Sequence, residues 1–322
     1  MARITHRQLQ VFAAVADSLS FARVAERLHL SPSAVSFQIR EIEQQIGLDL
    51  FERIGRGVAL SEAGAVLLKH ARPALQSMAD VEEAMRALKN GDVGEIRLGL
   101  VSTAKYLVPH LIARFRAEQP GIVVLLQEEN RRGITALLAN GSVDMAIMGR
   151  PADEGAVVAE RFAPHPSVIV APPGHRFAQV DSVPPQALMR DFFVLREPGS
   201  GTRALADRFF ADQAASPRIA MESSSNEMVK QAVMAGMGVS LLSQHTIALE
   251  RSLGLLSVLP VTGFPVMRAW FIARRRNAPL LPAQAALWRF VTERGDALIA
   301  EILGQFSAAG RAAPGAFSRI AT

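Results

Sequence analysis

The chain has 322 residues, a formal net charge of +5, 49% hydrophobic residues and no cysteine. This length suits roughly two or three domains that each have a hydrophobic core. The lack of cysteine excludes disulfides, thiolate metal sites and cysteine nucleophiles. No long apolar run follows the N-terminal basic residues or occurs elsewhere. We therefore expect a cytoplasmic protein with neither a signal peptide nor a membrane partner.

Residues 21–60 have the pattern of two short helices joined by a tight turn and followed by a hairpin. Apolar residues recur every three or four positions in both helices, Ser31 is a good N-cap for the second, and Pro32 suits its first position. The small, polar and basic residues at the start of the second helix are typical of a recognition helix in the DNA major groove. We therefore expect residues 1–60 to form a winged helix-turn-helix that binds double-stranded DNA. The candidate DNA contacts are Ser31, Pro32, Ser33, Ser36, Phe37, Arg40, Arg53 and Arg56.

A further amphipathic helix precedes this motif and is expected to cover the other two helices. Its apolar face consists of Leu9, Phe12, Ala13, Ala16 and Leu19. Net charge alone does not favour DNA binding, because residues 1–60 contain seven Arg and no Lys against six Asp or Glu. Affinity must then depend on where the arginines lie. Two alternatives stay open: Arg40 could pair with Glu41 or Glu43 in its own helix, and the hairpin arginines could simply be solvated.

Residues 61–92 are predicted to be a linker helix that mediates dimerisation. From residue 61 to 90 there is no strand character, and residues 90–94 break the helix. Pro73 should bend this helix or start it afresh. Apolar residues spaced alternately four and three apart form one seam, which favours a homodimer, although the helix could instead pack on its own domain. The seam consists of Leu67, Ala71, Ala74, Met78, Val81, Met85 and Leu88.

Residues 93–300 alternate between strand and helix patterns, which predicts α/β lobes with parallel sheets covered by helices on both faces. About 200 residues of this pattern suggest two lobes that bind a ligand at the carboxyl ends of their strands. Residues 301–322 are rich in small residues and are expected to be a disordered tail. The expected strands are 95–101, 122–129, 143–149, 167–172, 192–197, 218–223, 239–243 and 268–275, and the expected helices are 105–118, 131–140, 202–214, 225–236 and 283–300.

Polar and basic residues follow several of these strands, where helices begin. Hydroxyls, cations and free N–H groups at helix starts are what an anion requires. Individually the hydroxyls could be plain helix caps, and Ser224 with Glu227 fits a capping box. Their expected convergence on one face of two lobes predicts a site for a small anionic effector. The candidate residues are Ser102, Thr103, Lys105, Asn130, Arg131, Arg150, Ser200, Thr202, Arg203, Ser224 and Asn226.

Enzyme chemistry has little support in the sequence. Gly199-x-Gly201-x-x-Ala204 is similar to a dinucleotide fingerprint, but Pro198 shortens the turn and no N-terminal βαβ unit surrounds it. The seven histidines have no metal-ligand spacing, and no serine lies in a G-x-S-x-G elbow. We expect neither catalysis nor a cofactor or metal. The alternative is a solute-binding protein or an enzyme with the same two lobes. The 90 N-terminal residues argue against this alternative.

From Leu9 to about Phe290, the chain resembles the LysR-type transcriptional regulators. The N-terminal part of this resemblance is LSPSAVSFQIREIEQQIGLDLFER followed by VALSEAG. Phe37 stands where the family often has a basic residue. The C-terminal segments VSTAKYLVPHLIARF, DMAIMGRP, REPGSGTR and ESSSNEMVKQAVMAGMGVSLLS look like those of the activators of Rubisco and Calvin-cycle operons.

This resemblance implies a winged helix-turn-helix, a linker helix and a periplasmic-binding-protein-like effector domain, assembled as a homotetramer. It further implies operator DNA and RNA polymerase as partners. The effectors of the Calvin-cycle subgroup suggest a sugar phosphate, phosphoenolpyruvate or a nicotinamide nucleotide as the ligand.

Overall fold

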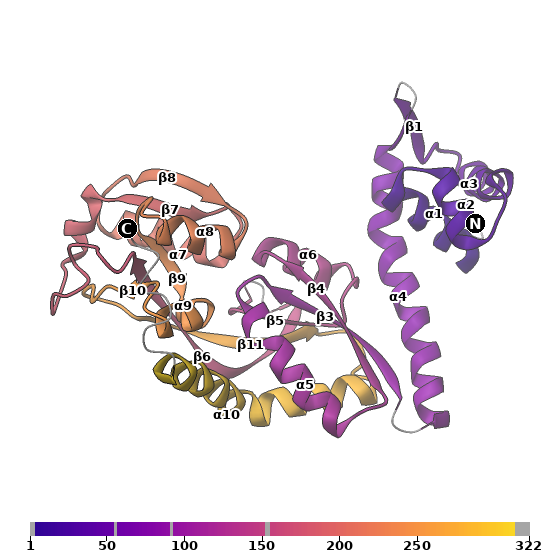
Figure 1. Cartoon of the computed structure of the whole chain (residues 1–322). Helices are drawn as coiled ribbons and strands as arrows, with labels where there is room; N and C mark the ends of the chain where they lie inside the picture. Colours follow the sequence, from indigo (N-terminus) through magenta and orange to yellow (C-terminus); the bar gives the residue numbers. More distant parts are fainter. Residues whose placement is uncertain (1–3, 55–56, 91–92, 152–154, 313–322) are drawn as a thin grey trace. The chain divides into compact units, whose positions relative to one another are not determined.

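The computed structural model describes residues 4–54, 57–90, 93–151 and 155–312. The chain divides into two compact units near Lys89 and Asn90 (Figure 1). Each unit is a separate body with its own hydrophobic core. Within the described ranges, no helix combines the length and the apolar character needed to cross a membrane.

The N-terminal unit has three short helices and a hairpin in the order that the sequence predicts. Ser31 caps the third helix by accepting a 3.1 Å hydrogen bond from the backbone N–H of Ala34, and Pro32 occupies the first helical position. His29 ends the second helix in the left-handed conformation, with φ = 53°. The strands of the hairpin pair antiparallel. The elements are α1 (His6–Ser18), α2 (Phe21–Leu28), α3 (Pro32–Ile46), β1 (Phe51–Ile54) and β2 (Gly57–Leu60).

The predicted apolar face of α1 is wrong at its C-terminal end. Leu19 lies beyond the helix, has a left-handed φ of 49°, and is 46% exposed. The buried face of α1 instead runs through Val11, Phe12, Ala14 and Val15. These residues recur at helical spacing on one face, while the turn at Leu19 directs the chain toward α2.

The linker forms one continuous helix, α4 (Glu62–Asn90), so Pro73 does not start it afresh. The alternative that the helix packs on its own domain holds for only part of the seam. Leu67 and Ala71 pack against the core of the N-terminal unit, whereas Met78, Val81 and Met85 are about half exposed. Ala74 is also exposed, and the side chain of Leu88 is outside the described part of the structure.

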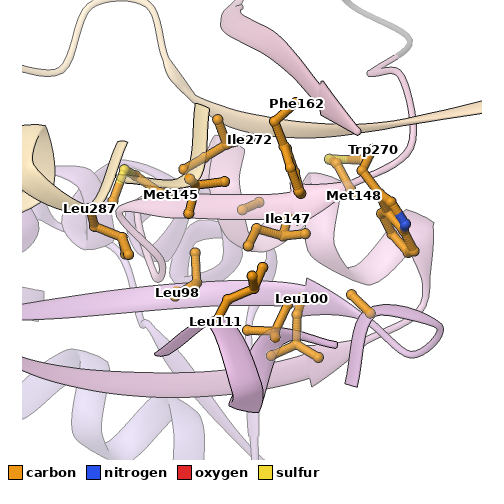
Figure 2. Close-up of a cluster of buried hydrophobic side chains, with 14 of the residues drawn as sticks. Leu98, Leu100, Leu111, Met145, Ile147, Met148, Phe162, Trp270, Ile272 and Leu287 are labelled. Carbon is orange, nitrogen blue, oxygen red and sulfur yellow. The ribbon is translucent and has the colours of Figure 1, made fainter. Parts of the chain in front are cut away.

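The second unit contains two lobes, each with an α/β arrangement. Lobe I surrounds a core in which Leu98 of β3, Ile147 of β5 and Ile272 of β11 meet Leu111 of α5 and Leu287 of α10 (Figure 2). In this lobe β3 is parallel to both β4 and β5. The elements of lobe I are β3 (Gly94–Val101), η1 (Ala104–Tyr106), α5 (Val108–Glu118), β4 (Ile122–Glu129), α6 (Arg131–Ala139), β5 (Met145–Met148) and α10 (Pro282–Ala312).

Lobe II surrounds two smaller clusters of buried side chains that lie between residues 168 and 261. Its strands β7 and β8 are parallel, and β9 and β10 pair antiparallel with β6. The elements of lobe II are η2 (Pro185–Arg190), β7 (Phe192–Arg196), α7 (Gly201–Asp212), β8 (Arg218–Ser223), α8 (Asn226–Met234), β9 (Ser240–Ser243), η3 (Gln244–Ile247), α9 (Ala248–Ser252) and β10 (Ser257–Val258).

Two long strands, β6 (Val157–Ala171) and β11 (Val266–Arg275), connect the lobes (Figure 1). They pair antiparallel with each other, and β11 also pairs antiparallel with β5. The prediction of parallel sheets holds for the pairs that β3 forms with β4 and β5 and for β7 with β8, but the main sheet is mixed, with the order β10-β6-β11-β5-β3-β4. The first part of β6 was not predicted, since Glu160, Arg161 and Pro164 interrupt its apolar pattern.

The predicted disordered tail is wrong for its first half, because α10 continues to Ala312. Ile302 is only 7% exposed in the core of lobe I. The ring of Phe306 stacks edge-on against His110, with 6.1 Å between ring centroids. Apolar residues at helical spacing thus keep this segment on lobe I despite its small residues. Residues 313–322 lie outside the described part of the chain.

Candidate functional site

The N-terminal unit presents one face of α3 to solvent. Val35, Ile39 and Ile42 are buried and fix the helix on its unit, while Ser33, Phe37 and Arg40 are exposed on the other side. Ser36 is partly exposed on the same face, and Ser31 and Pro32 are exposed at the helix start. Small and basic groups at the N-terminal end of such a helix can reach base edges and phosphates.

Arg40 does not pair with the acidic residues of its helix in the described structure. Its Nε donates a 3.4 Å hydrogen bond to the carbonyl of Ser36, and no ion pair joins it to Glu41 or Glu43. Glu43 instead accepts a 2.9 Å hydrogen bond from the backbone N–H of Leu50. The guanidinium of Arg40 thus lies free of carboxylates on the exposed face of α3.

The hairpin extends from the same unit. Phe51 anchors it, because its ring lies 5.6 Å from that of Phe12 and 5.8 Å from that of Phe21. Arg53 on β1 is exposed and pairs in register with Val58 of β2. Arg56 lies outside the described residues.

The second unit has a cavity of about 720 Å³ between its two lobes. The ends of β3 and β4 and the start of α6 line it from lobe I, and the start of α7 lines it from lobe II. Polar strand-to-helix junctions that are far apart in the sequence thus face one space. Seven of the eleven predicted effector contacts line this cavity, namely Ser102, Thr103, Asn130, Arg131, Arg150, Ser200 and Thr202.

Lys105 and Arg203 are not among the residues that line this cavity. Lys105 pairs with Glu128 at 3.2 Å. Arg203 pairs with Asp207 at 2.8 Å and with Glu222, and it lines a separate cavity of about 570 Å³. Both side chains are therefore paired with carboxylates. Glu128 and Glu222 are distant in the sequence, and Asp207 is one helical turn from Arg203.

Ser224 and Asn226 are also not placed in the cavity. Ser224 is exposed and does not cap α8, because Ser225 is the N-cap and accepts a 3.3 Å hydrogen bond from the N–H of Met228. The predicted capping box of Ser224 and Glu227 is therefore wrong, because the carboxylate of Glu227 instead bonds to Tyr106 and Lys230. Asn226 is fully buried and its side-chain carbonyl accepts a hydrogen bond from Arg196.

Several residues that line the cavity were not predicted from the sequence. Arg161 and His165 lie in the part of β6 that was not predicted, and Arg208 is on the second turn of α7. Arg268 lies on β11, two positions before the buried Trp270 and four before the buried Ile272. Because side chains alternate between the two faces of a strand, Arg268 lies on the same face as these two buried residues. An arginine in step with buried apolar residues is a sequence signal that could have been recognised.

Positive charge dominates the cavity. Five arginines contribute to its wall, and none of its described lining residues is Asp or Glu. Burial and the nearby charge of Arg131 lower the pKa of Arg268 to about 10, so Arg268 remains charged at neutral pH. The arginines are Arg131, Arg150, Arg161, Arg208 and Arg268.

Two buried imidazoles lie close together, His165 beside Arg268 and His245 with its ring centroid 5.9 Å from that of His165. His165 stacks on Trp270 with ring centroids 3.8 Å apart and an interplanar angle of 11°. Burial, Arg268 and His245 together hold the pKa of His165 well below its usual value. Burial lowers the pKa of His245 to about 4, and its Nδ1 accepts a 3.0 Å hydrogen bond from the indole N–H of Trp270. Both rings are therefore neutral at pH 7.

The lobes also contact each other beside the cavity. Tyr106 of lobe I donates a 2.5 Å hydrogen bond to Glu227 of lobe II, and burial with the adjacent carboxylate raises the pKa of this tyrosine. Lys230 lies 4.7 Å from the centre of the Tyr106 ring and pairs with Glu250 at 2.6 Å. These contacts connect η1 to α8.

A winged helix-turn-helix joined by a long helix to a two-lobed ligand-binding unit defines a ligand-responsive transcriptional regulator. Comparison with known proteins identifies the family. Residues 6–65 match the model of the bacterial regulatory helix-turn-helix protein, lysR family, and residues 89–296 match the LysR substrate binding domain. The chain therefore belongs to the LysR family of transcriptional regulators.

Several transcriptional regulators are similar to this protein over most of the chain. The chain is 42% identical to the HTH-type transcriptional regulator CfxR of Cupriavidus necator. The matched 302 residues cover 94% of each of the two chains. It is 42% identical over 288 residues to the RuBisCO operon transcriptional regulator of Allochromatium vinosum, covering 89% of this chain and 95% of that one. The relatives are DNA-binding regulators, so the chain is not an enzyme.

A solved structure resembles the second unit. The regulatory domain of CcmR from Synechocystis, in complex with 2-PG, is 31% identical. It covers 67% of this chain and 97% of that chain, with a TM-score of 0.56.

Proposed function

We propose that this regulator controls, and activates, genes of RuBisCO and carbon fixation in response to a small anionic metabolite held between its lobes. The similarity to the RuBisCO operon transcriptional regulator of Allochromatium vinosum supports the choice of genes. The cavity supports the choice of ligand, because it combines five arginines with hydroxyls and has no acidic residue in its described lining. This cationic cavity is the observation that carries the proposal.

The same features favour a phosphorylated ligand. A sugar phosphate, phosphoenolpyruvate or a nicotinamide nucleotide carries the charge that five guanidinium groups can neutralise. The regulatory domain of CcmR, solved in complex with 2-PG, supports a small ligand for the second unit of this chain. Of the predicted contacts, the seven residues that line the cavity stay in this proposal, and Lys105, Arg203, Ser224 and Asn226 are no longer part of it.

We further propose that DNA is read by a homodimer, which pairs into a homotetramer in the cytoplasm. Met78, Val81 and Met85 form an exposed apolar row on α4. Covering this row with a second copy of α4 removes apolar surface from water. Two copies would present two recognition helices to two half-sites of an operator, where the protein would contact RNA polymerase.

Ligand and DNA would be coupled through the relative positions of the lobes. A ligand shifts such an equilibrium only if it binds one arrangement of the lobes more tightly than another. A ligand that contacts both lobes at once has this property. In the proposed mechanism, α4 passes the resulting change to the spacing of the two recognition helices.

Two measurements test this function on the full-length protein. Footprinting on the upstream region of its own gene should show a protected operator at moderate salt, and no protection would contradict the regulator proposal. A thermal-shift panel should show stabilisation by at least one of 2-PG, a sugar bisphosphate, phosphoenolpyruvate or a nicotinamide nucleotide, relative to potassium chloride at equal ionic strength. A shift with a non-phosphorylated aromatic acid and none with these compounds would contradict the ligand class.

A further inference from the structure

Gly201, the first residue of α7, lines the cavity next to two of its arginines and leaves a small recess there because it has no side chain. A Cβ atom added at Gly201 would lie 3.5 Å from Cδ of Arg131 and 3.8 Å from Nη1 of Arg268. Arg131 begins α6 in lobe I, Gly201 belongs to lobe II, and Arg268 lies on the connecting strand β11. Three separate segments of the chain thus converge around this space.

Arg268 is held in place entirely by neutral acceptors. Its Nε and Nη2 donate to the hydroxyl of Ser167 at 3.1 and 2.8 Å, and its Nη1 donates to the carbonyl of Gly201 at 3.3 Å. Nη2 also lies 3.5 Å from Nε2 of His165. Among the described residues, no carboxylate pairs with this largely buried guanidinium. An uncompensated buried charge is costly, and an anion in the cavity would offset that cost.

Arg131 is partly exposed, and like Arg268 it lacks a carboxylate partner among the described residues. Its Nη2 donates a 3.0 Å hydrogen bond to the carbonyl of Arg150, and within the described chain it has no acidic partner. The charges of Arg131 and Arg268 are close enough for Arg131 to lower the pKa of Arg268. Two like charges held this close indicate a position for an anion between them.

The start of α7 supplies the third side of the space. Ser200 caps the helix, and its hydroxyl accepts from the N–H groups of Thr202 at 3.2 Å and Arg203 at 3.5 Å. The N–H of Gly201 has no hydrogen-bond partner among the described residues. A free N–H at the positive end of a twelve-residue helix favours an anion.

We propose that the recess formed by Arg131, Arg268 and the N–H of Gly201 binds a phosphoryl group of the effector. This inference rests on the proposed function and specifies where the charge of the ligand is held. A phosphoryl group has three terminal oxygens that can accept from donors in three directions, whereas a carboxylate has two in one plane. Because Arg131 and Gly201 belong to different lobes, the bound group joins the lobes and favours the arrangement seen here.

Gly201→Ala provides the sharpest test. The new methyl group would fill the recess at ordinary contact distances, and the backbone of Gly201 is not in the left-handed region, so the fold should be retained. Calorimetric titration of the full-length protein with 2-PG and with inorganic phosphate is expected to show at least about tenfold weaker binding for this variant. Arg268→Gln should have the same effect. Unliganded thermal midpoints and operator binding should match the wild type for Gly201→Ala.

Arg132→Ala is the matched control, because Arg132 is exposed, follows Arg131 directly, and lines the separate 570 Å³ cavity. Its affinity for both probes should equal that of the wild type. Wild-type affinity in Gly201→Ala would overturn the proposed recess. If the wild type bound acetate or malonate but not phosphate, the proposed recess would also be overturned. An operator footprint obtained with the same preparation would show that the regulator function still holds.

Hydrogen exchange measures the joining of the lobes independently. Saturating 2-PG should slow amide exchange at the start of α6 and at the start of α7 in the same experiment. Protection of only one of these helices would contradict a phosphoryl group shared between lobes. In Gly201→Ala, protection should be lost at both.

Discussion

The guanidinium of Arg196 in lobe II donates a 2.9 Å hydrogen bond to the hydroxyl of Ser102 in lobe I. Ser102 was predicted as an effector contact, and it does line the cavity, yet its oxygen already serves a buried arginine from the other lobe. The same guanidinium also bonds to Glu197 and Asn226. Arg196 therefore connects the end of β3 with β7 and the start of α8.

Arg196→Met should destabilise the second unit far more than Ser102→Ala. Removing Ser102 leaves Arg196 with two other partners, and we expect a loss of about 1–2 kcal/mol. Removing Arg196 leaves Glu197 and Asn226 without their cation, and we expect about 3–5 kcal/mol. Denaturant unfolding followed by tryptophan fluorescence measures both values, with the exposed Arg132→Ala as a control near zero. Equal losses for Ser102→Ala and Arg196→Met would show that the guanidinium contributes only through Ser102.

His245 makes the stability of the second unit depend on pH. Its pKa in the folded protein, about 4, is below the usual 6.5, so the unfolded chain takes up the proton first as the pH falls. The stability contributed by neutral His245 is complete above pH 6.5 and is lost between 6.5 and about 4. The total loss is about 3 kcal/mol.

His245→Asn should remove this dependence while keeping an acceptor for the indole N–H of Trp270. Unfolding free energies of the wild type and the variant, measured from pH 7 to 4, should converge as the pH falls. Parallel curves would mean that His245 does not carry the effect. Carboxylates titrate in this range in both proteins, so only the difference between the curves is informative.

Arg40 and Arg53 should affect DNA binding in different ways. Arg40 lies on the exposed face of α3, and its replacement by Ala should weaken operator binding by about 1–3 kcal/mol more than binding to unrelated DNA. Arg53→Ala on the hairpin should weaken both equally and reduce the salt slope by about one. Fluorescence anisotropy at several salt concentrations distinguishes them. Equal weakening by Arg40→Ala on both DNAs would assign Arg40 to phosphate contact instead.

A charge in the exposed row of α4 should disrupt self-association. Val81 is 56% exposed in the single chain, so Val81→Asp should leave the monomer folded but bury a carboxylate in the proposed helix pair. Light scattering after size-exclusion chromatography should show smaller assemblies, and operator affinity should fall with the loss of the second half-site. Glu82→Gln, on an adjacent exposed position, is the control. An unchanged mass for Val81→Asp would place the interface elsewhere.

The N-terminal unit could be predicted closely from sequence because its signals are local. Ser31 and Pro32 mark the start of α3 by their own chemistry. The cavity could be predicted only in part, because its members come together through contacts between distant segments. Nothing near Lys105 in the sequence indicates that Glu128 neutralises it, and nothing near Arg203 indicates Glu222. Arg161 and His165 were not predicted as cavity residues, because the polar first part of β6 does not have the pattern of a strand.

The pairing of β6 with β11 contains a bulge beside the cavity. Trp270 pairs with Ala163 and Phe271 pairs with Arg161, so Phe162 has no partner across the ribbon. A bulge bends and twists a two-stranded ribbon locally. Phe271 and Arg161 also line the cavity. A ligand in the cavity would therefore contact the two strands that join the lobes at the position where their regular pairing is interrupted.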